Sequence, residues 1–226
     1  MAESLTGRRN FHALFLALFL GVWYLDLTNL DPKFLIIPGA HWSRLVWLTM
    51  LDLTFQTVYH AVALLVCITG VGAKNQSFHY MARSFFQPIA MCTFLLFWEL
   101  WLFDPATLAK DENASKLIEF WPWNHGLHTL PLFSAVGDLI MWNRRTPATK
   151  SAMKAIVAFA LFYTCNVTFF NWLSGGGWAY PILGELNTFT RGLFYAVSAS
   201  HIALSFFVLR WVNKTILGRT EDRKRR

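Results

Sequence analysis

Long apolar stretches alternate with short polar connections along the whole chain. Each stretch holds about 20 residues, the length that an α-helix needs to cross the hydrocarbon core of a bilayer. Gly, Pro and Asp residues, which end helices or begin turns, stand between the stretches. The pattern predicts six membrane-spanning helices, at 11–30, 43–70, 84–103, 123–142, 153–173 and 190–212. We therefore expect an all-α membrane protein in which residues 1–226 form a single six-helix transmembrane domain.

The distribution of basic residues predicts which side of the membrane each connection faces. Cytoplasmic connections of membrane proteins carry an excess of Lys and Arg over those on the opposite side. With a cytoplasmic amino terminus, the basic residues on that side are Arg8, Arg9, Lys74, Arg83, Arg144, Arg145, Lys150, Lys154, Arg210, Lys214, Arg219, Arg223, Lys224, Arg225 and Arg226. The opposite, exoplasmic side has Lys33, Arg44, Lys110, Lys116 and Arg191, together with acidic residues that include Asp26. Both termini are therefore expected in the cytoplasm, and the chain as an integral, multi-pass protein of the endoplasmic reticulum or the plasma membrane.

The composition supports a membrane protein and argues against several other classes. Hydrophobic residues make up 55% of the chain and charged residues 15%, whereas soluble domains carry about 25% charged residues. The net charge of +7 does not indicate a nucleic-acid partner, because the basic residues are spread over short connections and the carboxyl-terminal tail. Cys67, Cys92 and Cys165 all lie in apolar stretches, without the spacing of a metal site or of a disulfide framework. We therefore predict no metal and no cofactor.

Two polar residues capable of catalysis, Thr49 and His128, lie inside apolar stretches at the same predicted depth. Thr49 comes six residues after position 43, which places it about 9 Å below the exoplasmic end of the second predicted helix. His128 comes five residues after position 123, about 7–8 Å below the same end of the fourth predicted helix. The two residues therefore share one leaflet, where a polar group is costly and a functional role is the first hypothesis.

These two residue types suit nucleophilic catalysis. A threonine hydroxyl attacks poorly until a base removes its proton, and a neutral imidazole is the usual base. The base in turn needs a group that fixes its tautomer and orientation. Asn124 stands four residues before His128 on the same helical face, and Asp52 stands three residues after Thr49. Either of them can orient the imidazole, and Asp52 is favoured because it is charged. His125 is a candidate donor to a developing oxyanion.

Structural roles are the alternative for each of these residues. A threonine in a membrane helix commonly bonds the carbonyl four residues earlier, and small polar residues also join helices together. On residue type alone, a structural role is the more common one for Thr49. Ionisable groups such as His128 and Asp52 are rarer in membrane helices and more often functional. Glu99, toward the exoplasmic end of the third predicted helix, either lines the pocket or reaches the membrane interface.

Three short blocks of the sequence, taken in order, match one family of membrane enzymes. They are Leu48-Thr49 with Asp52-Leu53 and Gln56, then Trp123 with Asn124-His125-Gly126 and His128-Thr129, and finally Gly176, Trp178 and Tyr180-Pro181. Asp104, which closes the third predicted helix, fits the same pattern. Over most of its length the chain therefore resembles the androgen-induced membrane hydrolase family, which comprises androgen-induced gene 1 protein and androgen-dependent tissue factor pathway inhibitor-regulating protein.

The resemblance implies a six-helix hydrolase that cleaves fatty acid esters of hydroxy fatty acids inside the membrane. The family's threonine nucleophile corresponds to Thr49 in this sequence. Its catalytic histidine corresponds to His128 and not to His125. The resemblance further implies a lipid substrate that enters from the bilayer, acyl transfer to the threonine, and hydrolysis of the acyl-threonine by water. Trp178 and Tyr180 are expected to support the substrate site.

One residue departs from the family pattern. Glu99 stands where the family has an apolar residue. This difference leaves the implied chemistry intact and bears on the choice of substrate.

Three other functions compete with ester hydrolysis. A haem-binding electron carrier needs histidine pairs on facing helices, and His60 with His201 is the candidate pair. A transporter or proton path would use the relay groups Asp52, Glu99, Asp138 and His201. These groups lie at scattered depths, and no inverted repeat is visible in the sequence. A non-enzymatic regulator of another membrane protein is the third alternative, because a fold does not determine a function.

Overall fold

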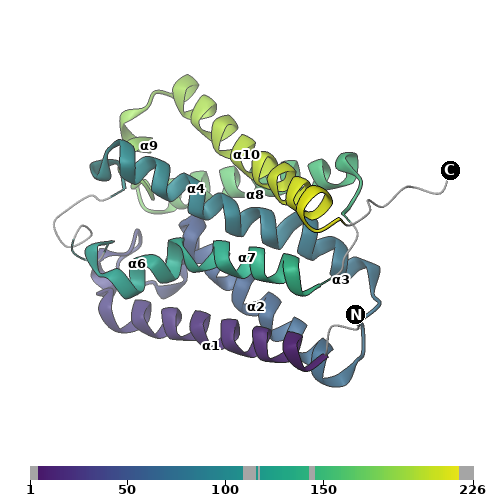
Figure 1. Cartoon of the computed structure of the whole chain (residues 1–226). Helices are drawn as coiled ribbons and strands as arrows, with labels where there is room; N and C mark the ends of the chain where they lie inside the picture. Colours follow the sequence, from purple (N-terminus) through teal and green to yellow (C-terminus); the bar gives the residue numbers. More distant parts are fainter. Residues whose placement is uncertain (1–4, 109–115, 117, 143–145, 219–226) are drawn as a thin grey trace.

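The structure is a computed structural model that describes residues 5–108, 116, 118–142 and 146–218. Every regular element in these residues is helical, which confirms the predicted all-α fold (Figure 1). The α-helices are α1 (Leu5–Asn29), α2 (Leu48–Thr69), α3 (Gln76–Met81), α4 (Gln87–Phe103), α6 (Trp121–His128), α7 (Leu130–Met141), α8 (Thr149–Leu173), α9 (Pro181–Glu185) and α10 (Thr188–Trp211). Shorter 3₁₀ or π segments are η1 (Pro32–Phe34), η2 (His41–Val46), η3 (Ala82–Phe86), η4 (Pro105–Thr107) and η5 (Val212–Ile216).

Five of the described helical segments are long and apolar enough to cross a membrane, as expected of a multi-pass membrane protein. They are Thr6–Asn29, Leu48–Thr69, Gln76–Phe103, Thr149–Leu173 and Thr188–Ile216. The predicted fourth helix consists instead of α6 and α7, which follow one another end to end (Figure 1). The break falls at Thr129, because Pro131 in the first turn of α7 has no N–H to donate to the preceding turn.

The second predicted helix begins later than position 43, and this changes the surroundings of Thr49. Residues His41–Val46 form η2, Trp47 has an extended backbone (φ −79°, ψ 132°), and α2 starts at Leu48. Thr49 therefore lies in the first turn of α2 and not deep inside a helix. The third predicted helix begins earlier than position 84, at Gln76, where α3 and η3 lead into α4.

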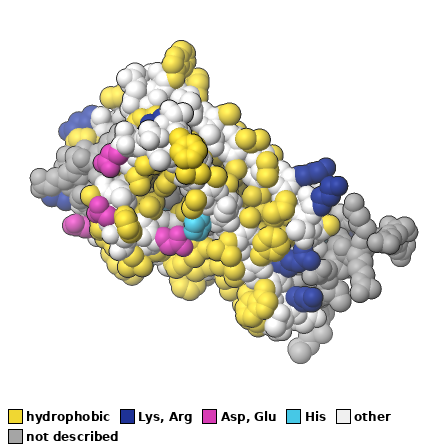
Figure 2. Space-filling model, turned by 90° about the horizontal axis from the view of Figure 1, so that it is seen from above, with side chains coloured by type: hydrophobic (Ala, Val, Ile, Leu, Met, Phe, Trp, Pro, Cys, Tyr) yellow, Lys and Arg dark blue, Asp and Glu magenta, His cyan; other side chains and the backbone are white. Residues whose placement is uncertain are grey.

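The spanning helices pack side by side as a bundle. Helix α2 lies against α1, α4 lies between α7 and α10, and α10 also packs on α8 (Figure 1). The described chain begins and ends at the same end of the bundle. Figure 2 shows the face that carries α10, where hydrophobic side chains predominate and Lys and Arg side chains gather toward the end with the termini. Lys and Arg side chains also lie at the opposite end, where Asp and Glu side chains are found. An apolar belt between charged ends is the surface expected of a protein embedded in a bilayer.

A glycine allows α6 to approach α1 closely. A Cβ atom at Gly126 would lie 2.5 Å from Val22 Cγ2 and 3.3 Å from Val22 Cγ1. Val22 is buried and packs with Phe19 and Leu127 in the core between these helices. Because α6 also carries His128, this close approach helps to set where the imidazole lies in the bundle.

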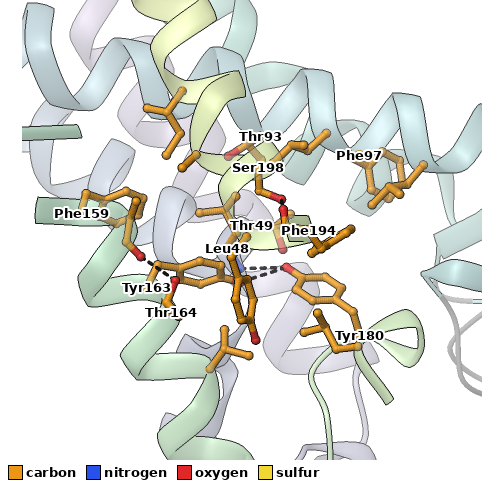
Figure 3. A pocket seen from close by; sticks show the side chains of 18 of the residues that line it. Leu48, Thr49, Thr93, Phe97, Phe159, Tyr163, Thr164, Tyr180, Phe194 and Ser198 are labelled. Atoms are coloured by element: carbon orange, nitrogen blue, oxygen red, sulfur yellow. Dashed lines mark hydrogen bonds between the residues drawn. The ribbon is translucent and has the colours of Figure 1, made fainter. Parts of the chain in front are cut away.

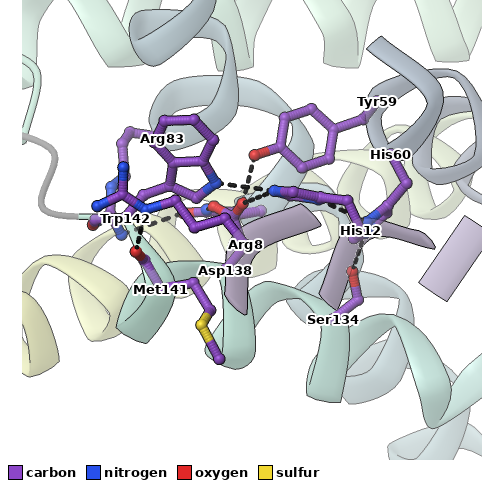
Figure 4. Close-up of polar contacts among 10 residues, drawn as sticks. Arg8, His12, Tyr59, His60, Arg83, Ser134, Asp138, Met141 and Trp142 are labelled. Atoms are coloured by element: carbon purple, nitrogen blue, oxygen red, sulfur yellow. Dashed lines mark hydrogen bonds and ion pairs between the residues drawn. The ribbon is translucent and has the colours of Figure 1, made fainter. Parts of the chain in front are cut away.

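A buried chain of hydrogen bonds links α1, α2 and α7 away from Thr49 (Figure 4). Trp142 Nε1 donates to His12 Nε2 (2.8 Å), His12 Nδ1 lies 3.0 Å from His60 Nδ1, and His60 Nε2 lies 2.7 Å from Ser134 Oγ. Since an indole nitrogen only donates, a neutral His12 must carry its proton on Nδ1 and donate to His60. His60 then donates to Ser134 from Nε2. In this arrangement His60 donates to Ser134 and cannot act as its base. These hydrogen bonds therefore serve to join the helices.

Asp138 belongs to the same buried network and ties α7 to α2 and to α4. Its Oδ1 accepts a hydrogen bond from Tyr59 Oη (2.5 Å), and its Oδ2 accepts one from Gln87 Nε2. Arg8 Nε donates to Met141 O (2.9 Å) at the end of α7. These contacts satisfy polar groups that would be costly in an apolar interior, and they stabilise the bundle at this end.

Candidate active site

Two tyrosines hold the backbone that leads into Thr49. Leu48 N donates to Tyr180 Oη (3.0 Å), and Tyr163 Oη on α8 donates to Val46 O (3.1 Å). The two phenol oxygens are 3.3 Å apart (Figure 3). The loop before α9 and the middle of α8 therefore both fix the start of α2, which positions Thr49 at the edge of the bundle core.

The Thr49 hydroxyl is not bonded to its own helix, unlike most threonines of the spanning helices. Six others donate to the carbonyl four residues earlier: Thr28, Thr54, Thr57, Thr69, Thr164 and Thr168. The corresponding carbonyl for Thr49 belongs to Leu45, and it accepts a hydrogen bond from Asn166 Nδ2 (2.9 Å). Within the residues that the structure describes, the Thr49 hydroxyl has no hydrogen-bond partner. The structural role that is most common for a membrane threonine therefore does not apply here.

The backbone N–H of Thr49 is also available to a ligand. Leu48 N donates to Tyr180, while Met50 N and Leu51 N both donate to Trp47 O. Among the described residues, Thr49 N has no backbone acceptor. The first N–H groups of a helix lack intrahelical partners and carry the positive end of the helix dipole. Thr49 thus offers a hydroxyl and an adjacent N–H donor at the same place.

His128 is oriented by Asn124 on the same helix. His128 Nδ1 lies 2.7 Å from Asn124 Oδ1 and 2.9 Å from Asn124 O. Both partners accept hydrogen bonds, so Nδ1 carries the proton and Nε2 keeps its lone pair. The imidazole stacks on Phe97 of α4, with ring centroids 3.4 Å apart and planes 8° from parallel. This is the tautomer that a base needs in order to accept a proton at Nε2.

Thr49 and His128 line the same cavity, which has a volume of about 450 Å³. Its wall also includes Phe97, Tyr180 and Trp123, with Asp26, Asp31 and Lys116 contributing charged groups. Over the described part of the chain, no hydrogen bond joins Thr49 Oγ1 to His128 Nε2. Catalytic hydrogen bonds are often long or absent until a substrate is bound, so the absence of this bond does not exclude the pair.

Tyr180 can donate a hydrogen bond into the same cavity. Burial raises the pKa of its phenol, so the hydroxyl keeps its proton at neutral pH. The oxygen accepts from Leu48 N, and because Tyr163 donates its proton to Val46 O, the Tyr180 proton faces Tyr163 Oη, 3.3 Å away, an acceptor that a substrate oxygen would replace. The arrangement therefore comprises a hydroxyl, an imidazole lone pair and two donors around one cavity.

A family model described as FAR-17a/AIG1-like protein matches residues 8–214, a range that includes both Thr49 and His128. The chain belongs to this family. The match confirms the resemblance inferred from the sequence blocks around these two residues.

Relatives within the FAR-17a/AIG1-like family are similar over most of their length. Human androgen-dependent TFPI-regulating protein is 24% identical over 185 residues, which cover 77% of this chain and 76% of the human protein. The rat protein of the same name is 26% identical over 163 residues, with 69% and 70% covered. Human androgen-induced gene 1 protein is 23% identical over 188 residues, with 76% and 74% covered. No solved structure matches the chain.

In this member of the FAR-17a/AIG1-like family, Asp52 does not orient the imidazole. The preference for Asp52 was wrong, because both acceptors at His128 Nδ1 belong to Asn124. Asp52 Oδ1 instead accepts a hydrogen bond from Gln56 Nε2 (2.9 Å), and Gln56 also donates to Phe86 O (3.1 Å). The charge of Asp52 made it the favoured candidate. Asn124, however, lies four residues before His128 on the same helix, so its hydrogen bond to the imidazole does not depend on packing between helices.

His125 points away from the cavity that holds Thr49. Its Nδ1 lies 2.9 Å from Thr129 Oγ1, and its ring packs against Trp98 and Trp121, with centroids 5.3 and 5.1 Å away. His125 is not among the residues that line the cavity. The structure therefore does not place it where an oxyanion donor would be required.

Glu99 lies at the surface of the bundle and not in the pocket, which was one of the two positions expected for it. Its Oε2 lies 2.8 Å from His201 Nε2, and 54% of its side chain is exposed. The pair connects α4 to α10 on the outside of the bundle. Glu99 lines neither of the two cavities next to Thr49.

Trp178 and Tyr180 have different positions although they belong to one sequence block. Trp178 packs under the guanidinium of Arg191, whose Cζ is 4.1 Å from the ring centroid, and it does not line the cavity. The next residue, Ala179, accepts a hydrogen bond from Trp47 Nε1 (2.9 Å). Trp178 therefore holds the loop in place, while Tyr180 reaches Thr49.

The residues proposed for the competing functions lie in separate places. His60 bonds His12 and Ser134, whereas His201 bonds Glu99, so the candidate haem pair is not brought together. Asp138 accepts from Tyr59 in the buried network. The four proposed relay groups are accordingly divided among three sites and form no continuous path among the described residues.

A buried ion pair beside the cavity was not predicted from the sequence. Arg44 Nε donates to Asp26 Oδ2 (2.5 Å), and both side chains are almost fully buried. Trp123 Nε1 donates to Asp26 Oδ1 (3.3 Å). Asp26 and Arg44 were counted with the exoplasmic connections on the basis of the sequence. Both positions lie within predicted helices, however, and a charged residue in a membrane helix usually has a partner of opposite charge. The pair joins η2 to α1 and to the start of α6.

Proposed function

We propose that this protein is an intramembrane hydrolase of fatty acid esters of hydroxy fatty acids. Thr49 would be the nucleophile and His128 the general base. The observation that carries the proposal is the unbonded Thr49 hydroxyl, which shares a cavity with an imidazole whose Nε2 lone pair is free. Membership of the FAR-17a/AIG1-like family supports the same assignment, through the sequence blocks that contain both residues.

In the first step, the ester carbonyl carbon lies against Thr49 Oγ1. His128 Nε2 accepts the hydroxyl proton as the new O–C bond forms, and a tetrahedral intermediate results. Collapse of this intermediate breaks the bond to the alkoxy oxygen. His128 returns the proton to that oxygen, so a hydroxy fatty acid leaves and an acyl-threonine remains.

The negative charge on the carbonyl oxygen needs donors in both tetrahedral intermediates. Two are available beside the nucleophile, the N–H of Thr49 and the Oη–H of Tyr180. Donors that are fixed before reaction stabilise developing charge without reorganisation, and removal of one typically costs about a hundredfold or more in rate. We assign these two groups to the oxyanion.

In the second step, water hydrolyses the acyl-threonine. His128 Nε2 takes a proton from the water, whose oxygen attacks the acyl carbon, and the same proton restores the Thr49 hydroxyl as the fatty acid leaves. The cavity that both residues line also contains Asp26, Asp31 and Lys116, and polar walls of this kind admit water.

We also propose six membrane crossings with both termini in the cytoplasm, in the endoplasmic reticulum or the plasma membrane. Helices α6 and α7 together form the fourth crossing along the chain, which brings the five long segments to six crossings. Lys and Arg side chains gather near the termini, as expected of the cytoplasmic side (Figure 2). The predicted orientation also depended on basic residues outside the described ranges: Lys110, Arg144, Arg145, Arg219, Arg223, Lys224, Arg225 and Arg226. Protease access to a tag at either terminus tests the topology, and a tag protected from the cytoplasmic side contradicts it.

The hydrolase proposal is tested with the purified full chain in lipid nanodiscs. The substrate is a palmitoyl ester of a hydroxystearic acid, and both released acids are quantified by mass spectrometry. We expect the wild type and Thr49→Ser to release both products. Thr49→Ala and His128→Ala should each lose at least about a thousandfold in rate. Thr54→Ala is the matched control, because Thr54 lies on the same helix and donates to Met50 O. Hydrolysis by Thr49→Ala at the wild-type rate would show that the proposal is wrong.

A further inference from the structure

Thr49 lies where two cavities of different character meet. Besides the cavity shared with His128, a second and smaller one of about 80 Å³ opens beside Thr49 (Figure 3). Thr49, Phe97, Leu108 and Tyr180 line both of them. An ester held at Thr49 would therefore have a separate space on each side of its carbonyl carbon.

The smaller cavity is largely apolar, and most of its lining comes from three helices. Leu96 and Leu100 line it from α4, Phe159 and Ala160 from α8, and Ala199 from α10. Its described lining residues include no charged side chain.

Two of the hydroxyls in this lining are already occupied within their own helices. Thr164 donates to Ala160 O (2.9 Å) and Ser198 to Phe194 O (2.9 Å), as drawn in Figure 3. Thr93 Oγ1 and Tyr195 Oη, which also line the space, have no hydrogen-bond partner among the described residues. The rest of the lining is largely apolar, so a hydrocarbon chain suits this space better than a charged group does.

The larger cavity, called the polar cavity below because charged side chains contribute to its otherwise largely apolar lining, can accept a negatively charged group. It includes two aspartates, but each has a cation of its own: Asp26 pairs with Arg44 (2.5 Å) and Asp31 with Lys33 (2.7 Å). The acidic residues therefore do not exclude a carboxylate from this side.

We propose that the apolar cavity holds the part of the acyl chain next to the ester carbonyl, and that the polar cavity holds the hydroxy fatty acid with its carboxylate. This assignment rests on the proposed hydrolysis at Thr49. It makes the apolar cavity the determinant of acyl-chain selectivity. It also means that the hydroxy acid leaves through the polar cavity, which His128 lines and through which water reaches the acyl-threonine.

The assignment is tested by filling the apolar cavity and comparing acyl chains. Ala199→Phe adds bulk to the lining from α10, and Ala196→Phe on the same helix is the matched control, because Ala196 is exposed and lines neither cavity. The substrates are esters of one hydroxystearic acid that carry an acetyl, an octanoyl or a palmitoyl group. The measurement is the ratio of kcat/KM for the palmitoyl ester to that for the acetyl ester.

Ala199→Phe is expected to lower this ratio by about tenfold or more, since hydrophobic pockets discriminate chains on this scale. Ala196→Phe should keep the wild-type ratio. If Ala199→Phe does not fold, Ala160→Leu applies a smaller change from α8 and is expected to shift the ratio in the same direction.

An unchanged ratio in a folded variant overturns the assignment, as does a shift that follows the length of the hydroxy acid instead of the acyl group. Hydrolysis of the acetyl ester, and its loss in Thr49→Ala, reports on the proposed function separately. A protein that hydrolyses esters through Thr49 but shows no ratio change thus retains the function and loses only the chain assignment.

Discussion

Replacement of Asn124 by alanine tests how the imidazole is held. The substitution removes the Oδ1 acceptor 2.7 Å from His128 Nδ1, but the backbone carbonyl of Asn124 remains 2.9 Å from the same nitrogen. The proton on Nδ1 therefore keeps one acceptor, and the tautomer with a free Nε2 persists. The variant loses one of two hydrogen bonds that orient the ring.

The expected cost follows from the value of one neutral hydrogen bond. Such a bond contributes about 0.5–1.5 kcal/mol, which corresponds to a fall in kcat/KM of about two- to tenfold. Stacking on Phe97, at a centroid distance of 3.4 Å, still restrains the ring. The effect should therefore be far smaller than the loss in His128→Ala.

The assay is ester hydrolysis by full-length Asn124→Ala in nanodiscs, with thermal unfolding recorded alongside to confirm that the variant is folded. A hundredfold loss in a folded variant would refute the reasoning, because it would mean that the backbone carbonyl does not hold the tautomer. An unchanged rate would equally refute it, since the side-chain bond would then have no role in orientation.

Four further variants address the donors, the packing and the second histidine. Tyr180→Phe should lower kcat about a hundredfold by loss of an oxyanion donor, and Tyr163→Phe should lose less; equal losses would contradict the assignment. Gly126→Ala places a methyl group 2.5 Å from Val22 Cγ2, so the free energy of unfolding should fall by about 1–3 kcal/mol, measured by denaturation in detergent; an unchanged value would show that α1 and α6 are not closely packed there. His125→Ala should keep activity within about threefold, because its ring faces Trp98; abolished hydrolysis would place it in the chemistry.

The overall fold was largely predictable because hydrophobic periodicity and helix length are local properties of the sequence. The apolar stretches indicated every spanning segment, and the structure corrected mainly where helices begin or break. Pro131 interrupts the fourth predicted helix, and the extended backbone at Trp47 delays the start of α2. Both features depend on single residues that an average over a long apolar stretch does not reveal.

The candidate site was predictable as residue types but not as contacts. Thr49 and His128 lie in the same cavity, as their common depth suggested. The choice between Asn124 and Asp52 required the structure, because both stand at a helical spacing that allows interaction with their neighbours. Nothing in the sequence distinguished Phe97 from the other apolar residues of the third predicted helix. Its stacking on the imidazole depends on how α4 packs against α6.

Covalent labelling of Thr49 tests the central assignment most directly. A fluorophosphonate probe reacts with an activated hydroxyl nucleophile, and peptide mass spectrometry identifies the residue that is modified. We predict that the wild type and the control Thr54→Ala are labelled on Thr49, and that Thr49→Ala and His128→Ala are not labelled. Labelling of Thr49→Ala as strong as that of the wild type would contradict the assignment of Thr49 as the nucleophile.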